Sequence, residues 1–138
     1  MRVDFMMIGA QKAGTTSLAA QLAAHPQICF CRDKEPAYFH QAADWRADIE
    51  RYHALYNPRP GQLLGEASTH YTFFPEYRGT AERLYEYNPA LKLIYVMRQP
   101  VERIISLYTH NVVRELEKRP PDVAVFDDPT YVNRSRYG

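Results

Sequence analysis

The sequence predicts an α/β fold in which a parallel sheet is flanked by helices and a P-loop-like turn follows the first strand. Two observations predict it. Apolar runs of strand length alternate with helical segments, the order typical of βαβ units. The first of these runs leads into the glycine-containing stretch MIGAQKAGTT, residues 7–16, ahead of a helix. The chain of 138 residues is long enough for one core, so we expect a single domain over residues 1–138.

The first half of the chain alternates predicted strands and helices. Residues 3–8 are apolar and bounded by glycine, which is typical of a buried strand. Hydroxyl side chains at 15–17 favour a helix start, Leu18 and Leu22 lie on one face, and Pro26 follows the helix end. The elements predicted next are a strand at 28–30, a loop at 34–40, a helix at 45–56 and a strand at 63–67.

The second half continues the same alternation. Residues 76–87 predict a helix in spite of Gly79, and residues 91–97 form the clearest strand after the first. Pro100 suits the first turn of the long helix that follows, because its fixed backbone angle fits there and its missing N–H is not needed. We interpret residues 119–129 as a surface loop.

Composition and charge narrow the classes of partner. The net charge of +1 implies no broad basic face for nucleic acid or membrane, so an anion site must be local. Apolar runs of about 18 residues are absent, and the amino-terminal residues lack the features of a signal peptide. Cys29 and Cys31 are interpreted as buried thiols in a reducing compartment. We therefore expect a cytoplasmic protein without a membrane segment.

The turn after the first strand is the clearest candidate for a binding site. Gly9 and Gly14 occupy the glycine positions of the phosphate-binding motif G-x-x-x-x-G-K-[ST], but Thr15 stands where the motif has lysine. The one lysine, Lys12, lies inside the turn. Backbone N–H groups and the positive end of the helix dipole would make such a turn an anion cradle. The alternative is a turn with a purely structural role.

A second candidate lies where residues 91–97 run into the long helix. Arg98 at the strand end and Ser106 about two helical turns later supply a planar fork and a short hydroxyl donor, which suit a phosphate. The alternative for Arg98 is a surface ion pair. Arg103 is expected to be a solvated helix residue near Glu102. Ligands of parallel α/β folds bind at the carboxyl ends of strands, so this turn and the glycine turn should face one crevice.

Acid–base candidates come from two further segments. Glu35 in KEPAYFH has the surroundings of a general base, the alternative being a solvated loop carboxylate. Glu66 and His70 in GEASTHY follow a strand and are expected to face the same crevice, with His70 as base, donor or rim histidine. The chain has no H-E-x-x-H or H-x-H spacing, so no metal site is indicated.

Together these segments resemble the sulfotransferases that use 3′-phosphoadenosine 5′-phosphosulfate (PAPS), in their heparan-sulfate-type and bacterial branch. The order FMMIGAQKAGTTSL, HPQI, KEPAYF, GEAS, LKLIYVMRQPVERIISLY, NRSRY carries the resemblance. It implies the amino-terminal part of the sulfotransferase fold. FMMIGAQKAGTTSL resembles the loop that holds the 5′-phosphosulfate, and MRQPVERIISLY resembles the 3′-phosphate site.

The resemblance also implies roles for single residues. Lys12 would contact the bridging oxygen of the leaving phosphate, Glu35 would deprotonate the acceptor hydroxyl or amine, and His70 is a further catalytic candidate. No metal is implied. The donor PAPS, or its product PAP, would be bound by Gly9, Lys12, Ala13, Gly14, Thr15, Thr16, Ser17, Arg98 and Ser106.

Two departures from the family pattern qualify this assignment. Many relatives have GEKSP where this chain has GEAST, so Ala67 stands in place of a lysine, and His70 is a hypothetical substitute. The family continues with further strands after the segment that resembles NRSRY, so we expect the domain to be incomplete at its carboxyl end. The expected acceptor is a carbohydrate or small molecule and not a nucleic acid. The alternatives are an inactive or truncated PAP-binding module and, less favoured, a P-loop kinase that uses ATP.

Overall fold

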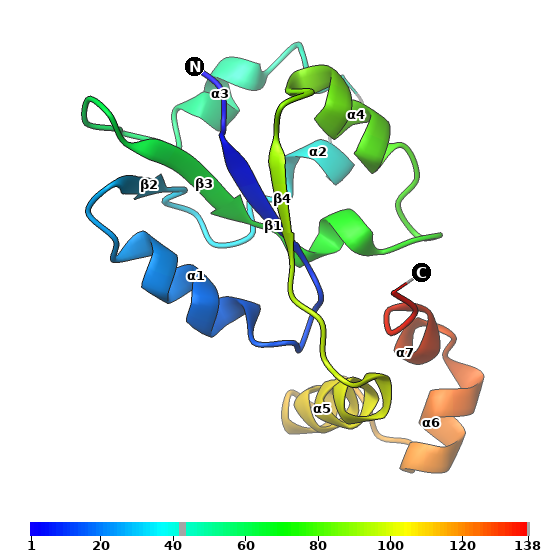
Figure 1. The fold of residues 1–138 in the computed structure, drawn as a ribbon. Coiled ribbons are helices and arrows are strands. Elements are labelled where there is room, and N and C mark those ends of the chain that lie inside the picture. Colours follow the sequence, from blue (N-terminus) through cyan, green and yellow to red (C-terminus); the bar gives the residue numbers. More distant parts are fainter. Residues whose placement is uncertain (42–43, 138) are drawn as a thin grey trace.

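The computed structural model describes residues 1–41 and 44–137, which form a four-stranded parallel sheet with helices around it (Figure 1). The strand order is β2-β3-β1-β4. The sheet confirms the predicted α/β class. Its strands are β1 (Phe5–Gly9), β2 (Ile28–Phe30), β3 (Leu63–Ala67) and β4 (Lys92–Tyr95). The bounds of β2 and β3 match the predicted ones, whereas β1 starts two residues later than expected and β4 is shorter at both ends.

Helices cover both faces of the sheet. Helix α1 (Thr15–Ala23) packs along β1, β2 and β3 on one face. On the opposite face lie α2 (Tyr38–Gln41), α3 (Ile49–His53) and α4 (Thr80–Tyr87), and the short 3₁₀ helix η1 (Thr69–Thr72) follows β3 (Figure 1). The described parts of the chain contain no helix that is both long and apolar enough to cross a membrane.

The main core lies between the sheet and the helices α2, α3 and α4, and it is rich in aromatic rings. The Phe39 ring packs against the rings of Tyr52 and Tyr87 at centroid distances of 5.3 and 4.8 Å. Buried aromatic pairs of this kind stabilise a core beyond the area that they bury. Four of the eleven tyrosines of the chain therefore serve packing in this core. The cluster consists of Val3, Met6, Cys31, Phe39, Trp45, Tyr52, Tyr56, Leu64, Tyr71, Leu84 and Tyr87.

A second, smaller core lies beyond the carboxyl end of β4. It joins α5 (Pro100–Val113), α6 (Pro121–Asp127) and α7 (Thr130–Asn133) (Figure 1). Pro100 occupies the first turn of α5 as predicted, and the Gln99 side chain accepts a hydrogen bond of 2.8 Å from the Glu102 N–H. Helix α5 lies beside the glycine turn, because Arg103 Nη1 is 3.5 Å from the Gln11 carbonyl.

The predicted surface loop at 119–129 is wrong, because α6 lies inside it. Pro121 stands in the first turn of α6, where proline is favoured. Ala124 is fully buried against Leu107 and Tyr131. The apolar residues of the segment, 123–126, are consecutive and so show no helical periodicity, and contacts with α5 and α7 decide its helical state.

Three other element predictions differ from the structure in extent. Helix α2 begins inside the segment 34–40 that was predicted as a loop, and α3 covers only part of the predicted helix 45–56. Helix α4 begins at Thr80 because Gly79 has φ 77°, a left-handed conformation that starts the helix there instead of at residue 76. The predicted helix 76–87 was therefore too long at its amino-terminal end, and the predicted helix 45–56 was too long at both ends.

Candidate active-site cleft

The glycine turn is anchored to the end of the neighbouring strand. The Ala10 N–H donates to the Val96 carbonyl at 2.7 Å, and the Val96 N–H donates to the Gly9 carbonyl at 2.8 Å. Gly14 directly precedes α1 and has φ 93°, and Lys12 has φ 67°. A non-glycine residue held in the left-handed region is uncommon and is typical of functional sites. The turn thus has a defined shape at the carboxyl ends of β1 and β4.

A cleft of about 460 Å³ opens at this edge of the sheet. It brings together most of the residues that the sequence singled out: the glycine turn, Glu35, Arg98 and Ser106. Gly9, Ala13, Ser17 and His70 do not line it. Its lining is Gln11, Lys12, Gly14, Thr15, Thr16, Lys34, Glu35, Thr69, Arg98, Ser106, His110 and Arg114. The prediction that the two turns face one crevice is confirmed.

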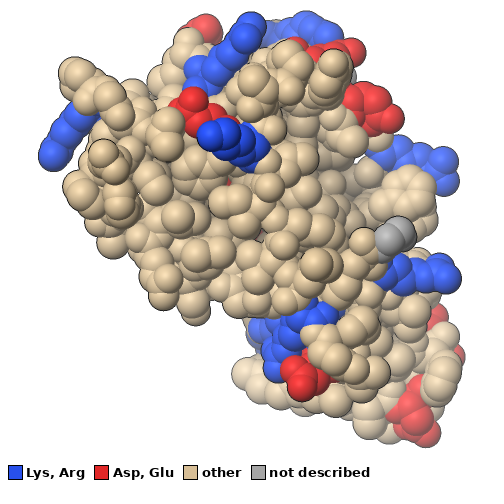
Figure 2. Space-filling view, viewed as in Figure 1, with Lys and Arg blue, Asp and Glu red and all other residues tan. Residues whose placement is uncertain are grey.

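The charge of the cleft suits an anion. Four of its lining residues are cationic, Lys12, Lys34, Arg98 and Arg114, against the single carboxylate Glu35. Lys and Arg side chains are visible at the notch between the sheet and α5 (Figure 2). Because the molecule as a whole is nearly neutral, this gathering of cations is local. The donor set of ammonium, guanidinium and hydroxyl groups fits a ligand with several phosphate or sulfate groups.

Arg98 is held near the glycine turn. Its Nη1 donates to the Lys12 carbonyl at 3.4 Å, and its Nε lies 3.3 Å from Oε2 of Glu102. The guanidinium is partly exposed, so it can turn towards an anion in the cleft without losing a buried partner. Both the predicted surface ion pair and the predicted position beside the cleft are therefore present.

Glu35 stands at the rim of the cleft with two polar neighbours. Its Oε2 accepts a hydrogen bond of 3.2 Å from Thr69 Oγ1 and lies 3.2 Å from His70 Nδ1. The close contact with His70 lowers the pKa of the Glu35 carboxyl, and partial burial opposes that effect. Glu35 has φ 53°, a second left-handed residue at this site. His70 thus lies behind the carboxylate, stacked on His40 at a centroid distance of 5.1 Å.

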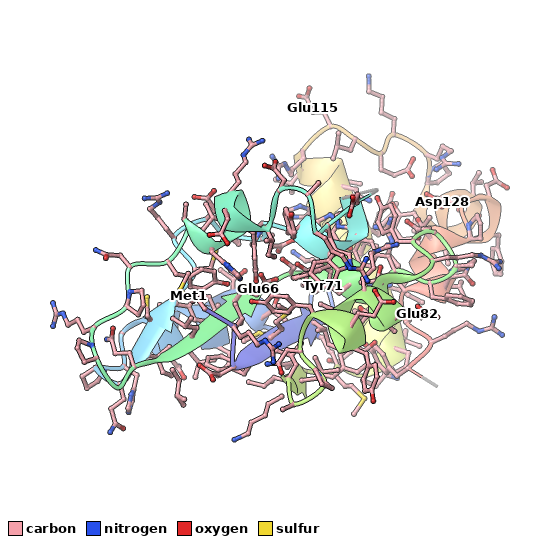
Figure 3. All side chains as sticks on the ribbon, turned by 90° about the horizontal axis from the view of Figure 1, so that it is seen from above. Met1, Glu66, Tyr71, Glu82, Glu115 and Asp128 are labelled. Carbon is pink, nitrogen blue, oxygen red and sulfur yellow. The ribbon has the colours of Figure 1, made fainter. Side chains whose placement is uncertain are left out.

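The prediction that Glu66 faces the crevice is wrong. Glu66 lies within β3, is fully buried and accepts a hydrogen bond from the Tyr52 hydroxyl. Figure 3 shows it beside Tyr71, among the side chains between the sheet and the helices. Burial raises the pKa of the Glu66 carboxyl. Alternation along the strand explains the error, because adjacent residues of a strand point to opposite faces. Ala67 therefore takes the side of α1, and Glu66 takes the side of the aromatic core.

The prediction that Arg103 is solvated is also wrong. Arg103 is fully buried. Its guanidinium donates to Ser135 Oγ at 2.6 Å and to the Tyr131 carbonyl at 2.7 Å, and more weakly to the Gln11 carbonyl at 3.5 Å. The residue therefore links α5, α7 and the glycine turn. Its position four residues before the buried Leu107 was the signal in the sequence, because such residues share a helix face.

Several residues of the cleft were missed in the sequence. His110 and Arg114 follow Ser106 at intervals of four, which places Ser106 and His110 on one face of α5 and Arg114 in line with them at its carboxyl-terminal cap. This spacing in the sequence could have indicated that α5 forms one wall of the cleft. Burial and the nearby Lys12 ammonium lower the pKa of His110. Gln11, Lys34 and Thr69 complete the missed set, and each is adjacent in sequence to a residue that was predicted.

In the described part of the chain, no three His, Cys, Asp or Glu side chains gather as a cation site.

The fold and the cleft together define a class: a parallel α/β protein with a cationic cleft, suited to a phosphorylated or sulfated ligand, where a strand, a glycine turn and a helix meet. Comparison with known proteins identifies the family within this class. The family model described as the sulfotransferase domain matches residues 2–133. The chain belongs to this family, as the resemblance of its motifs implied.

Individual proteins that this chain resembles are also named as sulfotransferases. The chain is 38% identical over 125 residues to the membrane-associated sulfotransferase kil1 of Dictyostelium discoideum, covering 86% of this chain and 25% of that protein. It is 34% identical over 137 residues to mouse heparan sulfate glucosamine 3-O-sulfotransferase 3B1, covering 94% and 31%. A crystal structure of a sulfotransferase from Alicyclobacillus acidocaldarius superposes with a TM-score of 0.80 at 29% identity, covering 98% of this chain and 64% of that one. The chain therefore spans between a quarter and a third of the length of these two curated relatives.

Proposed function

We propose that residues 1–138 form the donor-binding part of a sulfotransferase that transfers a sulfuryl group from PAPS to a hydroxyl or amine. One observation carries the proposal: the glycine turn, the pair Arg98 and Ser106, and the carboxylate of Glu35 border a single cleft. Membership of the sulfotransferase family supports PAPS as the donor. Relatives named for heparan sulfate glucosamine support a carbohydrate acceptor, and a small-molecule hydroxyl is the other candidate.

The donor would lie across the cleft with one phosphate at each turn. The amino-terminal turn of α1 presents N–H groups and hydroxyls to the 5′-phosphate, with Gly9 and Ala13 shaping the approach. Arg98 and Ser106 take the 3′-phosphate. PAPS supplies the sulfuryl group and a phosphate leaving group. The residues assigned to the 5′-phosphosulfate are Lys12, Gly14, Thr15, Thr16 and Ser17.

The chemistry requires a proton acceptor and a cation. Glu35 takes the proton of the acceptor hydroxyl as the new oxygen–sulfur bond forms. The bond between sulfur and the bridging oxygen breaks, its electron pair remains on the 5′-phosphate, and Lys12 stabilises that charge. His70 is a positioning residue, because its Nδ1 lies 3.2 Å from Oε2 of Glu35 and this contact lowers the pKa of the carboxyl.

The first experiment is calorimetric titration of the chain with PAP in EDTA, with ATP and Mg²⁺ as the comparison and circular dichroism to establish folding. We expect PAP to bind without metal and ATP to bind weakly. Preference for ATP with Mg²⁺ would favour the kinase alternative. PAP binding without any transfer from radiolabelled PAPS to a panel of sugars and phenols would favour the PAP-binding module.

Two substitutions test the assigned roles. Glu35→Gln should abolish transfer and leave PAP affinity within about twofold, because the amide keeps the shape and loses the base. Glu86→Gln, at an exposed carboxylate on α4, is the control. Loss of PAP binding in Glu35→Gln would contradict the role of base.

Arg98→Ala tests the 3′-phosphate site. It should weaken PAP at least tenfold and leave adenosine 5′-phosphosulfate, which has no 3′-phosphate, nearly unchanged. Equal weakening of both ligands in calorimetry would refute the assignment of Arg98 to the 3′-phosphate.

A further inference from the structure

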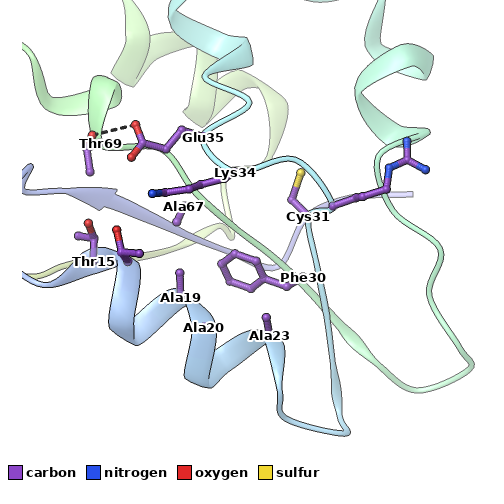
Figure 4. A pocket seen from close by; sticks show the side chains of 12 residues that line it. Thr15, Ala19, Ala20, Ala23, Phe30, Cys31, Lys34, Glu35, Ala67 and Thr69 are labelled. Carbon is purple, nitrogen blue, oxygen red and sulfur yellow. Dashed lines mark hydrogen bonds between the residues drawn. The ribbon is translucent and has the colours of Figure 1, made fainter. Parts of the chain in front are cut away.

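A second cavity adjoins the donor cleft and differs from it in chemistry. This apolar groove, of about 240 Å³, runs between α1 and the carboxyl ends of β2 and β3, with the segment that follows β2. Its walls are Ala19, Ala20 and Ala23 on α1, with Phe30 and Ala67 opposite (Figure 4). It is distinct from the donor cleft along most of its length, because none of these five residues lines that cleft.

The groove ends at the reacting groups. Thr15, Thr16, Lys34, Glu35 and Thr69 line both the groove and the donor cleft. In Figure 4, Glu35 and Thr69 lie at one end of the groove and Ala23 and Phe30 lie at the other. A molecule in the groove would therefore present one end to the Glu35 carboxylate while the rest lies along α1.

The walls of the groove consist mainly of alanine methyl groups and the phenyl ring of Phe30. No charged residue occurs in the sequence between Lys12 and Arg32, a stretch that contains all of α1 and β2. The outer face of the molecule over α1 is correspondingly free of Lys, Arg, Asp and Glu in the space-filling view (Figure 2). Cys31 also lines the groove, and burial raises the pKa of its thiol to about 11, so it is neutral.

The two cationic side chains that line the groove do not make its walls polar. Arg32 and Lys34 are both exposed, and long basic side chains keep their charged ends in water. Lys34 lies beside Glu35, at the end shared with the donor cleft (Figure 4). A sulfate or carboxylate placed between the alanines and Phe30 would lose its hydration without gaining a hydrogen-bond donor, which is costly.

We propose that the acceptor of this site is an alcohol or phenol with an uncharged, apolar ring-sized body, which lies between α1 and Phe30 with its hydroxyl at Glu35. The inference rests on the proposed function and narrows its acceptor class. Size supports a ring, since a cavity of about 150 Å³ is known to hold benzene, and the groove is somewhat larger. Ala67 is consistent with an apolar acceptor, because its methyl group extends the apolar wall of the groove.

The reaction balances with this acceptor. The hydroxyl proton passes to the Glu35 carboxylate, the acceptor oxygen bonds to sulfur, and the bond between sulfur and the bridging oxygen breaks to release PAP. The products are an organic sulfate ester, PAP and one proton, which Glu35 returns to solvent.

The test measures binding, so it does not depend on turnover. The full chain is saturated with PAP and titrated by calorimetry with 4-tert-butylphenol and, separately, with an N-sulfated glucosamine disaccharide. Two variants fill the groove, Ala19→Leu and Ala23→Leu, each replacing one good helix former by another. Gln21→Leu is the matched control, because Gln21 lies on α1 but does not line the groove. Circular dichroism and PAP affinity report the fold of each variant.

We expect the phenol to bind, both groove variants to weaken it at least tenfold, and Gln21→Leu to change it less than twofold, with PAP affinity unchanged in all three. The proposal is overturned if a folded chain that binds PAP does not bind the phenol, if the groove variants leave phenol affinity unchanged, or if the disaccharide binds and the phenol does not. If the phenol binds in the groove but PAP does not bind at all, the proposed function fails and the apolar site stands.

Discussion

Replacing Arg103 by methionine removes a buried guanidinium from the junction of α5, α7 and the glycine turn. Two short bonds are lost, those to Ser135 Oγ at 2.6 Å and to the Tyr131 carbonyl at 2.7 Å. Hydrogen bonds from charged donors contribute about 1.5–3 kcal/mol each, so the gross loss is about 3–6 kcal/mol. The third contact, to the Gln11 carbonyl at 3.5 Å, is too long to add much.

Two effects reduce that loss. Methionine does not require the desolvation of a buried cation, which offsets part of the stabilisation by arginine. The Tyr131 carbonyl also keeps a second partner, because Ser135 Oγ donates to it at 3.1 Å. We therefore expect Arg103→Met to lower the free energy of unfolding by about 2–4 kcal/mol, within the range for breaking a buried hydrogen-bond network.

The assay is urea unfolding followed by circular dichroism, with the midpoint compared at unchanged m value. Arg51→Met is the control, because the Arg51 side chain is 83% exposed and its ion pair with Asp48 is long at 3.8 Å; it should cost less than about 0.5 kcal/mol. If Arg103→Met is as stable as the wild type, the desolvation cost of the guanidinium equals its bonds and the reasoning is refuted.

Two further predictions concern pH and packing. His70 holds the pKa of Glu35 below its ordinary value of 4.5, so the ionised carboxylate contributes stability above that value. This contribution is lost as the pH falls through the lower pKa of the folded state, so the urea midpoint of the wild type should drop more steeply than that of Glu35→Gln below about pH 4.5. Parallel curves for the two proteins would contradict the coupling between His70 and Glu35. Gly65→Ala would place a Cβ against the Phe5 ring, closer than two such atoms can approach, and should destabilise the sheet by about 1–3 kcal/mol in the same assay. An unchanged midpoint would show that Phe5 can move aside.

Much of the fold could be predicted from local patterns. The strands β2 and β3 were located to the residue, because each is a short apolar run with a clear boundary. Helix α6 was missed, since only Ala124 is fully buried in it and its contacts come from α5 and α7. The amino-terminal ends of α3 and α4 were placed too early, as periodicity locates a helix better than its first residue.

Local patterns likewise predicted some residues of the candidate site and missed others. The glycine turn, Glu35, Arg98 and Ser106 were found because each belongs to a short segment with a chemical pattern of its own. The contact of His70 with Glu35 was not foreseen, because it joins a loop and a 3₁₀ helix that the sequence separates by 34 other residues. The cleft wall formed by His110 and Arg114 follows from helical spacing once α5 is known to face the turn.

The sequence by itself determined the α/β class, the glycine turn and the residue types that suit a phosphosulfate, since these depend on neighbours within one or two turns of chain. Only the tertiary structure decided which faces are covered. Arg103 is buried because α7 returns to it 28 to 32 residues later, and Glu66 is buried because the aromatic helices cover its side of β3. The apolar groove beside Glu35 arises likewise from α1, β2 and β3 together, since no single segment contains its two walls.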